Sequence, residues 1–499
     1  MGKVVLLGAG PGEIELLTIK GERLLKKADC IIYDRLANPA MLSLAPITSE
    51  KIFVGKKNHL HTMPQDKINE LLVEKANEYE LVIRLKGGDP YVFGRGGEEA
   101  IFLKEHGIEV EVVPGVSSSI AALSTAGIPI THRGLSKGFQ VITAHSKRDQ
   151  LSDIDYSQLT DDTVTLVFLM GLAHVAEIAK GLMSVGRDSA TPVAVISNGT
   201  TNHQSKCIGT LATIGEDIKK ANIVSPAIIV VGNVVSLSNQ LDFFEKRPLF
   251  GKKYFLPTIH HFNYSYIDGV IETDKNELED ALISLGAEVV RVQAGSISAD
   301  VIDLSFINDA CDGDYLVFTS ANGVKSFFWN LNTINKFDTR ILGKFKFAVI
   351  GHKTESALRS FGINADVISD VQNGIDLADR LNNAIDKPVA VHWLCCKDTS
   401  KGFEDNLRKD IVLSKHVCYE NISTELECSE ALIEDLKQCD GAIFTSGSNA
   451  TSTIPFIKNY MPKNIYSIGP ACSKKIRELG FDNIKEAKIS SYAGILELL

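Results

Sequence analysis

Short runs of aliphatic and β-branched residues alternate with amphipathic stretches along the whole chain. The amphipathic pattern is clearest over residues 64–78. The β-rich runs span residues 4–10, 30–34, 81–88, 140–145, 165–170, 192–199 and 226–232. Strands that alternate with helices in this way are typical of sheets covered by helices, so the pattern predicts the α/β class with largely parallel sheets.

The alternation breaks once, over residues 236–253, where the chain contains a proline and ends in basic residues. It then starts again. A chain of 499 residues also exceeds the roughly 100–200 residues of a typical domain. We therefore predict one domain at 1–240, a linker at 241–252 and a second domain at 253–499.

Composition and charge narrow the class of protein. With 44% hydrophobic and 23% charged residues, the chain has the make-up of a soluble globular protein. Its longest apolar runs fall short of the ~18–20 residues of a membrane helix, and its N-terminus does not resemble a signal peptide, so we expect no membrane partner and a cytoplasmic location. A net charge of −10 argues against nucleic acid as a partner.

The nine cysteines are sparse, and Cys395 and Cys396 are the only adjacent pair. No CxxC motif and no Cys/His pair with metal-ligand spacing is present. We therefore expect reduced, mostly buried thiols and no bound metal.

The second half contains an internal repeat. VFTSANGV (317–324) resembles IFTSGSNA (443–450), and VIGHKTESALRSFG (349–362) resembles SIGPACSKKIRELG (467–480), with similar spacing between the copies. The repeat predicts two similar α/β lobes, each with a strand, a turn and a helix in the same order. Two such lobes facing each other would form a cleft.

Three glycine- or serine-rich turns in the first half are candidates for ligand binding. GAGPG (8–12) lies between a strand and a helix, and Asp34 follows in the position of a dinucleotide fingerprint acid. However, Glu13 replaces the third glycine, and Pro11 removes a backbone donor, so a plain tight turn is an equal alternative.

The second turn, RLKGGDPYVFGRGGEEA (84–100), is denser in glycine than an ordinary loop. Gly87 and Gly88 allow close approach of a ligand, Asp89 offers an acceptor and Arg95 a fixed cation, although a surface loop remains an alternative. The third turn begins at residue 114, where Ser117 and Ser118 are candidate helix caps or ligand donors.

Together these motifs resemble uroporphyrinogen-III C-methyltransferase, a tetrapyrrole methylase. The resemblance covers about residues 3–240 and includes ADCIIYDRL (28–36), the RLKGGDPYVFGRGGEEA block and PGVSSSIAALSTAGIP (114–129). It implies two α/β subdomains with S-adenosyl-L-methionine, the methyl donor, bound between them, and a homodimer formed through this half. The family positions that contact the donor fall on Pro11, Gly87, Gly88, Asp89, Val92, Ser117, Ser118, Met170 and Gly199.

The resemblance also implies catalytic residues: Asp34 is the expected proton acceptor and Lys56 the expected donor. A carboxylate suits this role because a pyrrole carbon becomes nucleophilic as its N–H proton leaves. A strand-end cap or a salt bridge is the alternative for Asp34. The substrate has eight carboxylates, so we expect a basic cleft supplied from Lys56, Lys57, His59, His61, Arg84, Lys86, Arg95, His132 and Arg133.

The second half resembles uroporphyrinogen-III synthase through FTSANGV, IGHKTESAL, the FTSGSNA repeat and IGPACSKKIRELG. That family has two α/β lobes joined by a β ladder. The resemblance implies Tyr419 as the acid that helps water leave the linear substrate, although a buried core tyrosine is an equal alternative. The expected carboxylate-binding residues, which are equally typical of helix caps, are Thr319, Ser320, Lys353, Thr354, Thr445 and Ser446.

One position departs from the synthase pattern. The family usually has Thr-Arg at the end of its first strand, whereas this chain has PTIHH (257–261), with His260 or His261 as candidate replacements.

The two resemblances together predict a fused enzyme with tetrapyrrole substrates. Its C-terminal half would cyclise hydroxymethylbilane to uroporphyrinogen III, and its N-terminal half would methylate that ring twice to precorrin-2, on the way to sirohaem and cobalamin. Three alternatives stay open: methylation of a later corrin intermediate, a C-terminal half that only binds tetrapyrroles, and a nicotinamide oxidoreductase.

Overall fold

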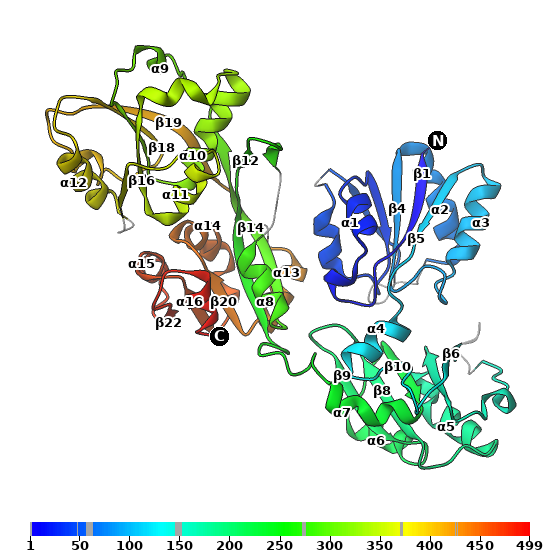
Figure 1. The fold of residues 1–499 in the computed structure, drawn as a ribbon. Helices are drawn as coiled ribbons and strands as arrows, with labels where there is room; N and C mark the ends of the chain where they lie inside the picture. Colours follow the sequence, from blue (N-terminus) through cyan, green and yellow to red (C-terminus); the bar gives the residue numbers. More distant parts are fainter. Residues whose placement is uncertain are drawn as a thin grey trace. The chain divides into compact units, whose positions relative to one another are not determined.

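The computed structural model describes residues 2–46, 48–55, 63–144, 152–271, 276–369, 373–424, 426 and 428–499. The chain forms two compact units, Met1–Gly251 and Lys252–Leu499 (Figure 1). Helices and strands alternate in both, which confirms the α/β class.

Unit 1 begins with a parallel five-stranded sheet in the order β3-β2-β4-β1-β5. Its strands are β1 (Lys3–Gly8), β2 (Cys30–Tyr33), β3 (Glu50–Phe53), β4 (Leu81–Lys86) and β5 (Glu109–Val113). Apolar residues of α2 (Gln65–Glu78) and α3 (Gly96–Glu105) pack on one face, and those of α1 (Ile19–Leu25) on the other. Because both faces are covered, the three inner strands β2, β4 and β1 are mostly apolar and buried, with Arg84 and Lys86 of β4 as buried exceptions.

The second subdomain of unit 1 has a five-stranded sheet in the order β6-β7-β10-β8-β9. Its strands are β6 (Gly138–Thr143), β7 (Val164–Leu169), β8 (Pro192–Ser197), β9 (Ser205–Thr210) and β10 (Ala227–Val231). Helix α4 (Ser118–Thr125) packs on one face, and α5 (Val175–Ser184) and α6 (Ile214–Lys220) pack on the other. Only β6 and β7 pair in parallel, so the expectation of largely parallel sheets is wrong for this subdomain.

Much of the segment predicted as a linker packs on unit 1. It follows the short helix α7 (Ser238–Leu241), and Phe244 is almost fully buried. Lys206 pairs with Asp242 at 2.8 Å, and Arg247 pairs with Glu13 at 3.1 Å. These contacts hold the segment against both subdomains up to the division at Gly251/Lys252.

Unit 2 is built on one ten-stranded sheet in the order β17-β16-β15-β18-β19-β14-β11-β20-β21-β22. A separate hairpin pairs β12 (Asn263–Ser265) with β13 (Gly269–Ile271). The sheet strands are β11 (Lys253–His260), β14 (Glu288–Ala299), β15 (Tyr315–Phe318), β16 (Lys346–Ile350), β17 (Val367–Ser369), β18 (Ala390–Cys396), β19 (Val412–Ser423), β20 (Gly441–Phe444), β21 (Asn464–Ser467) and β22 (Ile484–Glu486).

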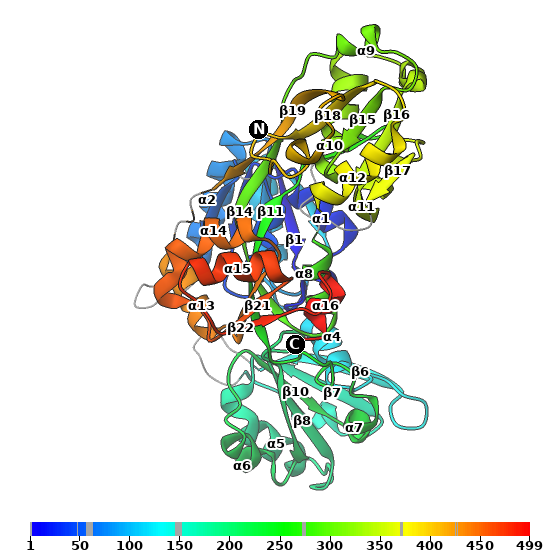
Figure 2. The same ribbon diagram turned by 90° about the vertical axis from the view of Figure 1, so that its left-hand side faces the viewer.

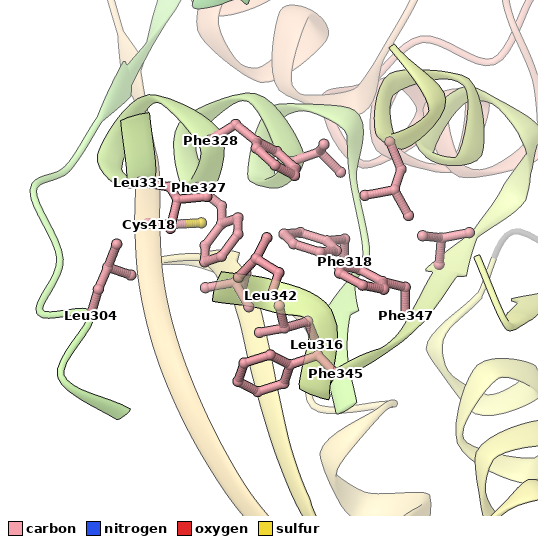
Figure 3. Close-up of a cluster of buried hydrophobic side chains, with 14 of the residues drawn as sticks. Leu304, Leu316, Phe318, Phe327, Phe328, Leu331, Leu342, Phe345, Phe347 and Cys418 are labelled. Atoms are coloured by element: carbon pink, nitrogen blue, oxygen red, sulfur yellow. The ribbon is translucent and has the colours of Figure 1, made fainter. Parts of the chain in front are cut away.

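The long strands β14 and β19 pair antiparallel over Gly295–Ala299 and Tyr419–Ser423 and so join two lobes (Figure 2). The first lobe has α9 (Phe306–Asp309), α10 (Ala321–Trp329), α11 (Gly351–Arg359) and α12 (Gly374–Ala384). The second has α8 (Glu277–Ser284), α13 (Glu430–Gln438), α14 (Gly447–Ile457), α15 (Pro470–Glu478) and α16 (Tyr492–Leu496). In the first lobe, Phe327 and Phe328 of α10 pack with Leu316 and Phe318 of β15 and with Cys418 (Figure 3).

The two repeat copies occupy matching places, which confirms the internal repeat. VFTSANGV runs from β15 into α10, and IFTSGSNA runs from β20 into α14. The following copies run from β16 into α11 and from β21 into α15. Each lobe therefore presents the same two turns at the carboxyl ends of adjacent parallel strands.

Candidate functional sites

Three glycines from three turns of unit 1 meet through their main chains. A Cβ on Gly8 would lie 2.5 Å from the backbone nitrogen of Gly115, and a Cβ on Gly115 would lie 2.2 Å from the carbonyl oxygen of Gly88. Gly10 and Gly88 exchange two backbone hydrogen bonds, of 3.2 and 2.7 Å. The carboxyl ends of β4, β1 and β5 thus form a floor without side chains, where a ligand can approach the backbone closely. We call Gly8, Gly88 and Gly115 the glycine floor.

Asp89 joins the glycine-rich block to this floor. Its Oδ2 accepts a hydrogen bond from the Gly115 N–H at 3.1 Å, and its Oδ1 accepts one from the Tyr91 N–H at 2.8 Å. Val92 is partly exposed in the same turn. Arg95 pairs with Glu98 of its own helix at 2.6 Å, so its guanidinium is engaged on the surface.

The donor-contacting positions predicted in the second subdomain lie in turns of unusual backbone geometry. Met170, Asn198 and Thr200 have positive φ angles, as do Phe93 and Arg95 in the glycine-rich block. These are five of the seven non-glycine residues with positive φ in the described chain. Such conformations cost ~1–3 kcal/mol each and gather at ligand sites.

Direct contacts bring the turns that contain Pro11, Ser117 and Gly199 together. The Glu13 N–H donates to Thr200 Oγ1 at 3.3 Å, which connects the turn containing Pro11 to the second subdomain. A Cβ on Gly199 would lie 2.3 Å from the Ala122 Cβ of α4. Ser117 caps that helix by accepting from the Ser119 N–H at 3.3 Å, and the Ser118 nitrogen lies beside Gly88.

Asp34 lies at the end of β2, in a turn against the glycine-rich block. Its Oδ1 accepts from the Leu36 N–H at 3.1 Å, and a Cβ on Gly87 would lie 2.5 Å from the Leu36 Cβ. Arg84 Nη2 lies 3.1 Å from Asp34 Oδ2. The carboxylate is therefore partly exposed. It is also fixed by a salt bridge, as the alternative interpretation of this residue predicts.

The basic residues expected around the substrate separate into three groups. Arg84 and Lys86 are buried and share Glu99 Oε1, at 3.4 and 3.0 Å, so both are already paired with a carboxylate inside the protein. His132 and Arg133 are exposed in the turn before β6. Lys56, Lys57, His59 and His61 lie outside the described residues.

In unit 2 the two repeat turns are helix caps with matching geometry. Ser320 Oγ accepts from the Gly323 N–H at the start of α10, and Ser446 Oγ accepts from the Asn449 N–H at the start of α14, both at 3.1 Å. Thr319 Oγ1 accepts from Trp393 Nε1 at 3.3 Å, and Thr445 Oγ1 accepts from Asn449 Nδ2 at 3.0 Å. The four residues lie where parallel strands end and helices begin, which is a favourable place for anions.

Tyr419 lies on β19 with only 6% of its surface exposed, and its Oη is 2.7 Å from Ser320 Oγ. Burial raises the pKa of its phenol, while the hydrogen bond with Ser320 opposes that shift. The phenol is therefore protonated at neutral pH. This is the state that an acid requires.

The two residues predicted on α11 differ in exposure. Thr354 is buried, whereas Lys353 is exposed and its Nζ lies 5.2 Å from the centre of the Tyr492 ring on α16. Desolvation lowers the pKa of His261, and the neighbouring Lys325 and Lys353 lower it further. Positive charge thus gathers where the family's Thr-Arg pair is replaced.

Two broader properties concern metals and membranes. Within the described ranges, no group of three or more His, Cys, Asp and Glu side chains is arranged to hold a metal ion. Across the same ranges, no helix is both long and apolar enough to cross a membrane.

Sequence reasoning missed several residues of these sites. Gly115 lies in the motif PGVSSSIAALSTAGIP (114–129), and its position directly after a strand was a usable signal. Thr200 and Glu99 gave no such signal, because an ordinary threonine and one of two adjacent glutamates acquire their contacts only in the folded chain.

Comparison with known proteins supports both halves. The family described as Tetrapyrrole (Corrin/Porphyrin) Methylases matches residues 3–215, and Uroporphyrinogen-III synthase HemD matches residues 276–497. The porphyrin biosynthesis protein HemD of Ruminiclostridium josui is 38% identical over 381 residues, which is 76% of this chain and 73% of that protein. A uroporphyrinogen-III C-methyltransferase of Bacillus subtilis is 40% identical over 366 residues, or 73% of each chain.

One similar solved structure is uroporphyrin-III C-methyl transferase from Thermus thermophilus complexed with S-adenyl homocysteine. Its sequence is 41% identical, and the match covers 47% of this chain and 93% of that chain, with a TM-score of 0.41. The family matches confirm both resemblances drawn from the motifs. The chain therefore belongs to the tetrapyrrole methylases through its N-terminal half and to the uroporphyrinogen-III synthase HemD family through its C-terminal half, as a bifunctional enzyme of tetrapyrrole biosynthesis.

Proposed function

We propose that unit 2 cyclises hydroxymethylbilane to uroporphyrinogen III and that unit 1 transfers two methyl groups from S-adenosyl-L-methionine to this ring, giving precorrin-2. The observation that supports methyl transfer best is the glycine floor, where the carboxyl ends of β4, β1 and β5 meet through their main chains and Asp89 accepts from the Gly115 N–H. Gly8 and Gly115 allow the turns to pack backbone against backbone, and a Cβ on Gly88 would meet only the Ser118 nitrogen, at 3.9 Å. The open side of Gly88 therefore fits a nucleotide-like donor lying against the backbone.

The residues proposed to hold the donor are those predicted from the motifs: Pro11, Gly87, Gly88, Asp89, Val92, Ser117, Ser118, Met170 and Gly199. When bound, S-adenosylmethionine supplies an electrophilic methyl group on a sulfonium. Asp34 is proposed to accept the pyrrole N–H proton as the ring carbon becomes nucleophilic, with Arg84 fixing the carboxylate. Lys56, the proposed proton donor, lies outside the described residues.

For the synthase, Tyr419 is proposed as the acid. The residues proposed to bind substrate carboxylates are Thr319, Lys353, Thr354, Thr445 and Ser446. In unit 1, the residues proposed to contact the ring are Arg95, His132 and Arg133. The family's missing Thr-Arg pair is compensated by His260 or His261, close to Lys325 and Lys353.

Two assays test this function on the full chain. Hydroxymethylbilane should yield isomer III, whereas isomer I alone would leave unit 2 as a binding module. Uroporphyrinogen III with S-adenosylmethionine should gain two methyl groups, and Asp34→Asn should reduce this rate by a factor on the order of 10²–10⁴, the usual contribution of a general base. A chain that methylates only a later corrin intermediate would contradict the methylase proposal.

We also propose a homodimer formed through unit 1 and a cytoplasmic location. All nine cysteines are free thiols, which suits a reducing compartment. Light scattering on the full chain and on a chain ending at Gly251, the boundary of unit 1, should give twice the monomer mass in both cases. A monomeric full chain would contradict the dimer.

A further inference from the structure

The two lobes of unit 2 match strand by strand. From the junction outwards, the first lobe has the order β19-β18-β15-β16-β17 and the second has β14-β11-β20-β21-β22. Even the irregularities correspond, because the register shifts between Cys395 and Cys396 on β18 and between Thr258 and Ile259 on β11. Past each shift, Cys396 pairs with Tyr419 and Ile259 pairs with Gly295. Tyr419 and Gly295 are therefore equivalent positions.

Because the second lobe has a glycine where the first has a tyrosine, the two serine caps differ chemically. Ser320 and Ser446 each accept a backbone N–H at 3.1 Å, but only Ser320 has a phenol beside it, at 2.7 Å. At the equivalent place in the second lobe, a Cβ on Gly295 would lie 2.5 Å from the carbonyl oxygen of Ile422. Backbone packing leaves no room there for a tyrosine, so the pair belongs to one lobe alone.

The hydrogen bonds of Ser320 allow its own proton to point at Tyr419. Its Oγ accepts from Gly323 at the positive end of α10, a nine-residue helix. The remaining hydroxyl proton can then be given to Tyr419 Oη, which leaves the phenol proton free to point elsewhere. A hydroxyl polarised by a helix N-terminus also stabilises the phenolate that remains after proton transfer.

We propose that Ser320 is a positioning residue for Tyr419, not a carboxylate-binding residue, and that proton donation is confined to the first lobe while Ser446 binds substrate in the second. The inference rests on the proposed synthase function.

In the step concerned, the Tyr419 O–H bond breaks and its proton passes to the hydroxyl oxygen of the substrate's hydroxymethyl group. The C–O bond breaks and water leaves with that electron pair, while the pyrrole nitrogen lone pair forms a C=N bond. The phenolate recovers the proton that the attacked ring carbon loses on closure.

The test compares steady-state formation of isomer III by full-length variants. Ser320→Ala should lower kcat by about 10- to 100-fold with KM within about twofold of wild type, a loss below the ~10²–10⁴ of a complete general acid. Ser320→Thr keeps the hydroxyl and should restore most of kcat. Ser446→Ala should instead raise KM.

Loss of a helix cap is controlled by Ser429→Ala. Ser429 caps α13 by accepting from the Leu432 N–H at 3.2 Å on the exposed surface, and its variant should keep wild-type kcat. If Ser320→Ala raised KM with unchanged kcat, or if Ser320→Thr failed to restore kcat, the positioning role would be wrong. A wild-type chain that forms only isomer I would overturn the proposed synthase function and this inference with it.

Discussion

Arg84 joins Asp34 to a buried group of charges: its Nη2 lies 3.1 Å from Asp34 Oδ2 and its Nε 3.4 Å from Glu99 Oε1. Lys86 Nζ approaches the same oxygen of Glu99 at 3.0 Å. Burial and the charge of Arg84 lower the pKa of Lys86. Glu99 is fully buried, and its Oε1 is shared by two buried cations, of which Arg84 also fixes Asp34.

Glu99→Gln should therefore destabilise unit 1 strongly. The substitution leaves the buried Lys86 without its carboxylate partner and leaves Arg84 paired with Asp34 alone. Breaking a buried pair in this way costs about 3–5 kcal/mol. Glu98→Gln is the matched control, because Glu98 is exposed and pairs with Arg95 on the surface, so the variant should change stability by less than about 1 kcal/mol. Urea unfolding followed by circular dichroism measures both. Equal losses in the two variants would show that the buried network does not stabilise unit 1.

Gly115→Ala should weaken binding of the methyl donor. The added methyl group would lie 2.2 Å from the Gly88 carbonyl oxygen and 2.7 Å from the Gly8 Cα, so the glycine floor must open. Overpacking of this kind costs about 1–3 kcal/mol, and we expect S-adenosylhomocysteine affinity to fall about tenfold or more by calorimetry. Gly97→Ala is the control, since a Cβ there has no atom within 4 Å. If the Gly115→Ala variant bound S-adenosylhomocysteine with wild-type affinity, the glycine floor would take no part in donor binding.

Much of this architecture was predictable because it depends on local patterns. The run at 30–34 became β2 (Cys30–Tyr33), and the repeated [ST]-rich turns led to two matching lobes, since each turn sits between a buried strand and an amphipathic helix. The glycine-rich block likewise proved to be where the main chain makes close contacts.

The remaining features depend on contacts between distant parts of the chain. Glu98 and Glu99 look alike in the sequence, yet one is exposed and the other fully buried under α2 and β4. Ser320 and Tyr419 are 99 residues apart and meet because β19 pairs with β18, which in turn pairs with β15. No local pattern predicts which neighbour a side chain acquires across a sheet.

Acid should destabilise unit 2 through a pair of histidines. His392 Nδ1 and His416 Nε2 are 3.1 Å apart, with Asp303 nearby. The Phe306 ring is stacked on His392 and tilted against His416, with 4.3 Å between ring centres in both cases. Burial and His392 lower the pKa of His416 from 6.5 to about 4, so folding favours the neutral ring. The stabilisation is thus complete above pH 6.5 and is lost as the pH falls towards 4.

Both tryptophans, Trp329 and Trp393, belong to unit 2, so their fluorescence reports its unfolding alone. We expect the free energy of unfolding to fall between pH 6.5 and 4.5, and His416→Asn to flatten that dependence while lowering stability at pH 7.5. An unchanged slope in the variant would assign the acid sensitivity to other groups.

The contact between Lys353 and Tyr492 should favour closure of the synthase lobes. Lys353 lies on α11 of the first lobe, and its Nζ is 5.2 Å from the ring of Tyr492 on α16 of the second. A cation over an aromatic face contributes about 0.5–1 kcal/mol at an exposed position, so Tyr492→Leu should raise the KM for hydroxymethylbilane by about two- to fivefold. Tyr492→Phe keeps the aromatic face and should stay near wild type. Tyr266→Leu, in the exposed turn of the β12–β13 hairpin, controls for loss of an aromatic ring elsewhere in unit 2. If Tyr492→Phe and Tyr492→Leu raised KM equally, the hydroxyl of Tyr492 would be the important group, because the cation–π contact survives in only one of them.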